Sequence, residues 1–142
     1  MRVFIPATPT DLAVANSGAW APQFAFAASP ELAIAVDDED VATEFARDAA
    51  AAESVLGLGA PRRLVIAADV PDPLVVPAPD RHPAAVKLNG PVPAGAVACA
   101  FVDEREAADD AAAAQDGDAE ALERLEWRDL LWYDVSELSD LA

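Results

Sequence analysis

The segment RRLVIAADV, residues 62–70, is the stretch of sequence that decides the fold. Its unbroken apolar middle predicts a strand in the interior of a sheet, covered on both faces or nearly so. Further apolar runs at residues 1–5, 24–27, 84–88 and 97–102 predict neighbouring strands. The chain is therefore expected to build a sheet from strands spread along most of its length.

Start and stop signals predict helices between these strands. TPT at residues 8–10 and SPE at residues 29–31 each place a capping side chain before a proline, which suits the first helical position. The longest helix is predicted over residues 41–56, and Gly57 ends it. The apolar side chains predicted to share its core-facing side are Val41, Phe45, Ala49, Ala52, Val55 and Leu56.

Residues 71–83 contain five of the twelve prolines, so this segment is expected to be an extended loop or the edge of the sheet. From residue 104 onward the chain carries 13 acidic side chains and three arginines. Helices are predicted over residues 107–114 and 119–127. The last apolar and aromatic segment, residues 130–138, is expected to dock on the rest of the chain.

This order of elements predicts an α+β fold: a two-layer sandwich with a mixed sheet of four or five strands and an acidic helical C-terminal part. A three-layer α/β arrangement is the alternative. The 142 residues suffice for one core, so a single domain spanning residues 1–142 is expected.

Composition restricts the partners. A formal net charge of -17 repels nucleic-acid phosphates and anionic lipids, so neither nucleic acid nor a membrane is an expected partner. No signal peptide or membrane-spanning segment is recognisable, and a cytoplasmic location is expected. The single cysteine, Cys99, lies in an apolar run and is interpreted as a buried core thiol.

Catalytic and cofactor motifs are not recognisable in the sequence. The only histidine, His82, lies in the proline-rich segment and is interpreted as a solvated loop residue. The acidic runs at residues 37–40 and 116–120 are interpreted as helix caps rather than metal ligands. We therefore predict no catalytic residue, no metal site and no cofactor, and expect that the chain is not an enzyme.

Six residues are nevertheless candidates for binding. Asp69 and Asp103 each follow a strong strand, and they share a crevice if those strands are parallel neighbours. Otherwise they are simple turn formers. Arg62 and Arg63 have two interpretations, an anion-binding patch or an internal counter-charge for the acidic helices, and the second is favoured because carboxylates are in great excess.

The aromatic residues Trp127, Trp132 and Tyr133 have two interpretations. They either anchor the C-terminal segment to the core or form the centre of a protein interface. Burial within the chain is the favoured interpretation, because a terminal segment needs such anchors. Trp132 and Tyr133 remain candidates for binding.

Four segments together resemble a family of small acidic actinobacterial proteins of unknown function. They are MRVFIPAT at residues 1–8, RRLVIAADV at residues 62–70, GPVP at residues 90–93 and LWYDVSEL at residues 131–138. The resemblance spans nearly the whole chain and implies no chemistry. Members of the family often have a histidine where this chain has Phe101, so a catalytic histidine at that position is excluded here.

Two functions remain open on these grounds. The favoured one is a non-enzymatic protein-interaction or regulatory module that acts through a protein partner or by self-association. The alternative is a carboxylate-based, possibly metal-dependent enzyme acting on a small molecule, centred on Asp69 and Asp103.

Overall fold

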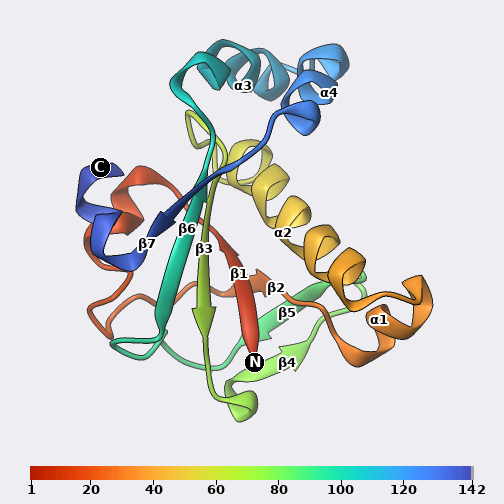
Figure 1. Ribbon diagram of the computed structural model, residues 1–142, viewed down its shortest axis with the longest axis vertical. Helices are drawn as coiled ribbons and strands as arrows, with labels where there is room; N and C mark the ends of the chain where they lie inside the picture. Colours follow the sequence, from red (N-terminus) through yellow and green to blue (C-terminus); the bar gives the residue numbers. More distant parts are fainter. Residues whose placement is uncertain (142) are drawn as a thin grey trace.

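Seven strands form one sheet in the computed structural model, which describes residues 1–141 (Figure 1). Their order across the sheet is β4-β5-β2-β1-β3-β6-β7, and every pairing is antiparallel. The strands are β1 (Arg2–Pro6), β2 (Phe24–Phe26), β3 (Leu64–Asp69), β4 (Val75–Pro77), β5 (Ala85–Leu88), β6 (Val97–Val102) and β7 (Leu131–Asp134). The α+β class is confirmed, whereas the mixed sheet of four or five strands and the parallel three-layer alternative are wrong.

The two strands missing from the prediction are the two edges of the sheet. β4 lies in the proline-rich segment, which was expected to be a loop or an edge, and β7 lies in the C-terminal segment that was expected only to dock. Both are short and pair on one side alone, so their strand conformation depends on a distant neighbour more than on local sequence. The five central strands agree with the predicted segments at residues 1–5, 24–27, 62–70, 84–88 and 97–102.

Helices α1 (Pro30–Val36) and α2 (Glu39–Leu56) lie on one face of the sheet, and α2 crosses β1, β2 and β3 (Figure 1). Helices α3 (Ala108–Gln115) and α4 (Ala119–Trp127) form a hairpin beyond the end of the sheet. The caps are as predicted: the Asp38 side chain accepts the first backbone N–H groups of α2, and Asp118 does so for α4. The predicted first helix is a short 3-10 turn, η1 (Pro9–Ala13).

Helix α2 packs on the sheet through its small residues, so the predicted core face is wrong except at Val55, which is buried. The side chains of Val41, Phe45 and Leu56 are 41–48% exposed. The buried side consists of small residues and one valine: Ala42, Ala46, Ala50, Ala51, Ser54 and Val55. Bulk comes from the sheet instead, where Phe4 and Phe26 fill the space beneath the alanines. Small helix residues opposite large sheet residues let the helix lie close to the strands.

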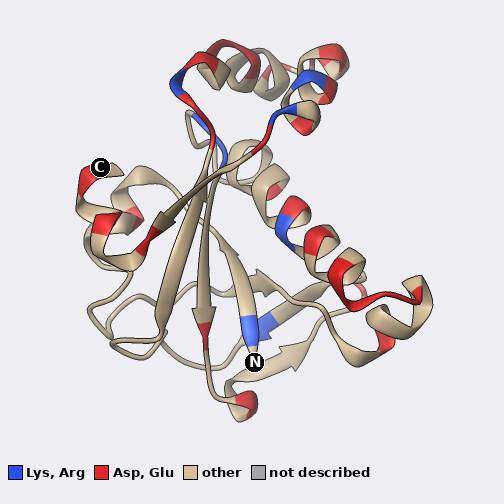
Figure 2. Cartoon of the chain, in the orientation of Figure 1, with Lys and Arg blue, Asp and Glu red and all other residues tan. Residues whose placement is uncertain are grey.

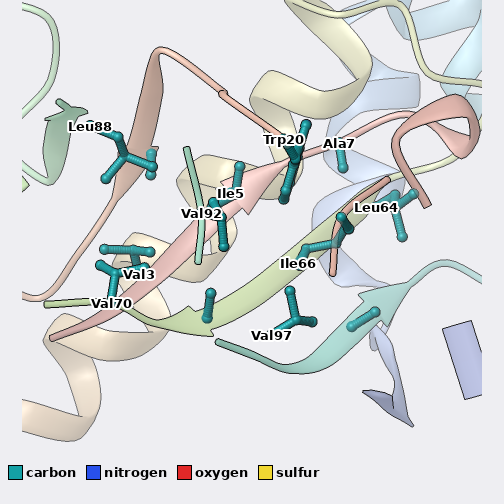
Figure 3. Close-up of a cluster of buried hydrophobic side chains, with 14 of the residues drawn as sticks. Val3, Ile5, Ala7, Trp20, Leu64, Ile66, Val70, Leu88, Val92 and Val97 are labelled. Atoms are coloured by element: carbon teal, nitrogen blue, oxygen red, sulfur yellow. The ribbon is translucent and has the colours of Figure 1, made fainter. Parts of the chain in front are cut away.

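The opposite face of the sheet carries a second core without a long helix. Val3, Ile5 and Ile66 project from the strands and pack against Trp20 and Val92 from the loops (Figure 3). The short turn η1 and the C-terminal 3-10 turn η4 (Val135–Leu141) cover this face, and Leu138 of η4 is buried in it. This contact confirms that the C-terminal segment docks on the rest of the chain.

Acidic side chains are concentrated on the helices, while the strands carry few charges (Figure 2). α2 has five acidic residues and one arginine, and α4 has three and one. Within residues 1–141, no helix combines the length and the apolar composition that crossing a bilayer requires.

Candidate functional site

A groove between the outer side of α2 and helix α4 is the candidate site, and we call it the outer groove. It has a volume of about 410 Å³, within the range of about 300–1,000 Å³ that is usual for binding pockets. Two helices and two loops contribute its lining: Phe45, Asp48, Ala49 and Ala52 of α2, Leu122, Leu125 and Glu126 of α4, Arg63 before β3, and His82 between β4 and β5. The groove is therefore apolar along its length and charged at its rim.

On the α2 side, the apolar lining consists of Phe45, one of the larger side chains that α2 turns away from the sheet, and of two alanines. Phe45, Ala49 and Ala52 are spaced at four and three residues, so they form one stripe along the helix. Leu122 and Leu125 of α4 face this stripe across the groove. Leu125 is fully buried in the small core that joins α3 and α4 to Val55 of α2. That core holds α4 in place as the second wall.

A buried ion pair fixes the inner end of the groove. Asp103 is fully buried, and its carboxylate accepts hydrogen bonds from Nε and Nη2 of Arg63 at 2.9 and 2.7 Å. The backbone N–H of Arg63 donates to the same carboxylate, and Arg63 Nη2 also donates to the carbonyl of Arg128. Arg63 thus joins β3, β6 and the segment after α4, and its charge is neutralised by Asp103.

His82 is part of the groove and is not the solvated loop residue that was predicted. Its ring stacks on Phe45 with 5.2 Å between the ring centroids and meets Phe26 edge-on at 5.4 Å. Its Nδ1 accepts a hydrogen bond from the backbone N–H of Ala84 at 3.0 Å. The neutral ring therefore carries its N–H at Nε2. The half-buried ring extends the apolar surface that Phe45 begins.

A second, polar cavity of about 360 Å³ adjoins the outer groove. The two share Asp48, Arg63 and Glu126, and the polar cavity adds Arg47 and Arg128. The guanidinium of Arg47 lies over the Phe101 ring at 5.4 Å, and its Nε is buried without a hydrogen-bond partner among the residues that the structure describes.

A larger cavity, of about 630 Å³, lies on another side of the molecule and is a weaker candidate. Its charged residues already have partners within the chain. Asp11 accepts hydrogen bonds from Thr8 in the cap of η1, and Glu53 pairs with Arg81, whose guanidinium also stacks on Phe24. These groups are used to hold loops together.

The structure separates Asp69 and Asp103. β3 and β6 are antiparallel, with Leu64 opposite Val102, so the two aspartates lie at opposite ends of the strand pair. The condition for a shared crevice, parallel neighbouring strands, is therefore not met. Asp69 binds Arg2 in a surface ion pair, with 2.8 and 2.9 Å between the nitrogens and the carboxylate oxygens. The arginine holds the pKa of the Asp69 carboxyl below its usual value.

The candidate arginines meet one of the candidate aspartates. Arg62 donates to the backbone carbonyl of Asp103 at 3.0 Å, beside the Arg63 ion pair. The contacts of Arg63 follow the counter-charge interpretation rather than that of an open anion-binding patch. The arginines and Asp103 were all candidates from the sequence. Their contact depends on the pairing of two strands that lie far apart in the chain.

The aromatic candidates have different environments. Trp127 and Trp132 are 83% and 59% exposed, so the favoured prediction of burial is wrong for both. Tyr133 is half-buried and packs against the core on the face opposite α2. The thiol of Cys99 is free and buried, as predicted. Burial raises the pKa of this thiol.

Phe45, Leu122 and Leu125 were not recognised as site residues from the sequence. Phe45 was predicted to face the core, because its spacing alone does not tell which of two helix faces meets the sheet. The α4 leucines carried a detectable signal, a short amphipathic pattern within an acidic helix. Their pairing with α2 is a tertiary feature.

The fold and the groove define a class of protein: an antiparallel α+β domain whose acidic helices enclose an apolar groove. A family model described as "Family of unknown function (DUF6912)" matches residues 1–142, and the chain belongs to this family. The resemblance to a family of unknown function is thereby confirmed. No curated protein and no solved structure matches the chain.

Proposed function

We propose that the protein is an interaction module that binds a basic amphipathic helix of a partner protein in the outer groove. The observation that carries the proposal is the exposed apolar stripe of α2, which α4 turns into a groove. Large apolar side chains aligned on a helix and left partly in water mark a surface that binds another protein. A helix that presents side chains at corresponding intervals fits such a groove.

Charge selects the kind of helix. Asp48 and Glu126 line the groove, and the charge of Arg63 is already balanced by Asp103. The two helices that form the walls carry eight acidic residues and two arginines. A partner helix with leucine-like anchors on one side and lysine or arginine beside them complements both the apolar floor and the acidic rim.

A synthetic helix tests this proposal directly. The probe is an 18-residue peptide with leucines at helical spacing on one side and lysines elsewhere, labelled with a fluorophore for anisotropy titration. We expect saturable binding that weakens as salt is raised, because exposed charges are screened within about 8 Å at physiological ionic strength. The same peptide with glutamate in place of lysine is expected not to bind.

Two matched substitutions test whether the peptide binds in the outer groove. Phe45→Ser removes an anchor of the groove and is expected to weaken binding by roughly tenfold, about 1.4 kcal/mol. Ile34→Ser is the control, because Ile34 is an exposed apolar residue of α1 that lies outside the groove. Equal losses in the two variants, or equal binding of the acidic peptide, contradict the proposal.

A further inference from the structure

The two edge strands of the sheet differ in their unpaired backbone groups. β7 is the edge strand with an outward N–H and C=O that have no partner within residues 1–141. The backbone N–H of Asp103, directly after β6, donates to the carbonyl of Arg63, directly before β3, and therefore points toward β3. Because backbone groups alternate in direction along a strand, Val102 and Ala100 of β6 face β7. Their partners are Leu131 and Tyr133, so the backbone N–H and C=O of Trp132 point away from the sheet.

The neighbouring outward group of β7 is already occupied. The backbone N–H of Asp134 donates to the side chain of Glu137 at 3.1 Å. Trp132 therefore contributes an outward N–H and C=O that have no partner within residues 1–141. No proline lies within β7, and no lysine or arginine lies within residues 129–141, so two of the devices that block an edge are missing.

The opposite edge, β4, has no free donor. The backbone N–H of Ala78 donates to Ala85 on β5, so Val75 and Pro77 face outward. The N–H of Val75 is bonded to the carbonyl of Asp72, and Pro77 has no N–H. β4 thus offers no unpaired outward N–H, whereas β7 offers one at Trp132.

We infer that β7 binds an extended, basic segment of a partner protein, which adds an eighth strand to the sheet beside Trp132. Charge identifies the occupant: residues 129–141 hold four carboxylates and no basic side chain. Lysine or arginine side chains of an added strand reach these carboxylates and the exposed face of the Trp132 ring. A second copy of this chain brings its own four carboxylates to the same place, which opposes self-pairing.

Amide hydrogen exchange measured by NMR tests this inference on the intact protein. The probe is an end-blocked eight-residue peptide of alternating lysine and valine. An added strand protects the Trp132 amide, and we expect its exchange to slow at least tenfold on binding. Binding that leaves this exchange unchanged overturns the inference. Protection that grows with protein concentration in the absence of peptide also overturns it, because a second copy then occupies the edge.

Three variants distinguish the contribution of the Trp132 backbone to peptide binding from that of its side chain. They also distinguish binding at the β7 edge from binding in the outer groove. Trp132→Phe keeps the N–H and is expected to bind the peptide within about threefold of the original chain. Trp132→Pro removes the N–H without touching the bonds to β6, and we expect at least tenfold weaker binding. Phe45→Ser is expected to leave strand binding unchanged, so failure here is distinguishable from failure of the proposed function. Equal affinity of the proline variant overturns the inference.

Discussion

Burial distinguishes two ion pairs of nearly identical geometry. Asp69 ends β3 and Asp103 directly follows β6, and each carboxylate accepts two hydrogen bonds from the guanidinium of one arginine. The first pair is surface-exposed, whereas the Arg63 and Asp103 side chains are 6% and 0% exposed. Solvent screens the surface pair, while the buried pair depends on its internal partners alone. The two aspartates therefore have different roles despite their similar sequence context.

Replacing each aspartate by asparagine is expected to separate these roles. Asp103→Asn leaves the Arg63 charge buried without a counter-charge and is expected to lower the free energy of unfolding by about 3–5 kcal/mol. Asp69→Asn is the matched control and is expected to cost at most about 1 kcal/mol. Urea unfolding of both variants measures the difference. Losses of similar size show that burial does not control the strength of these pairs.

The thiol of Cys99 predicts a pH dependence of stability. Burial raises its pKa in the folded chain, so the neutral thiol is the form that folding favours. Its contribution is complete below the ordinary thiol pKa of about 8.5 and is lost as pH rises through the raised folded value. We expect the free energy of unfolding to fall more between pH 8 and 10 than it does in Cys99→Ala. Parallel curves for the two chains contradict the prediction.

At the scale of elements, α2 has two apolar sides, one composed of small side chains and one that includes large side chains. The side with the small residues packs on the sheet. Large side chains dominate sequence patterns, because they have the most area to bury. Phe4 and Phe26 already occupy the space beneath the helix, so alanines opposite them give the closer fit. The displaced side chains of Val41, Phe45 and Leu56 stay partly in water. Because the small residues pack on the sheet, Phe45 lies on the outer side of α2 and lines the outer groove.

Substitution by leucine on each side of α2 tests this orientation. Ala46→Leu forces extra volume against the sheet and is expected to destabilise the fold by about 1–3 kcal/mol. Val41→Leu, on the exposed side of the same helix, is expected to change stability by at most about 0.5 kcal/mol. Thermal unfolding followed by circular dichroism compares the two. The opposite ranking places α2 on the sheet through its large residues.

At the scale of the whole molecule, the sheet separates two cores and leaves the charge on the helices. One core lies under α1 and α2, and the other lies under short turns and the C-terminal residues (Figures 1 and 3). The α-helices carry 11 of the 26 acidic residues, whereas the strands carry two (Figure 2). Both proposed binding surfaces, the outer groove and the β7 edge, therefore present acidic residues beside apolar ones. A basic partner segment satisfies either surface.

The amino-acid sequence by itself determined the features that depend on residues close together in the chain. The central strand β3, the cap at Asp38, the end of α2 near Gly57 and the buried Cys99 were all predictable. Each depends on contacts within about one helical turn or on the polarity of one continuous run.

Tertiary structure alone decided the strand order, the antiparallel pairing, the two edge strands and the face of α2 that is buried. It also decided which predicted residues meet: Arg63 with Asp103, but not Asp69 with Asp103. These features depend on contacts between segments tens of residues apart, such as positions 63 and 103. Local propensity does not predict such contacts. The same run of residues forms a strand or one face of a helix regardless of the segment on which it packs.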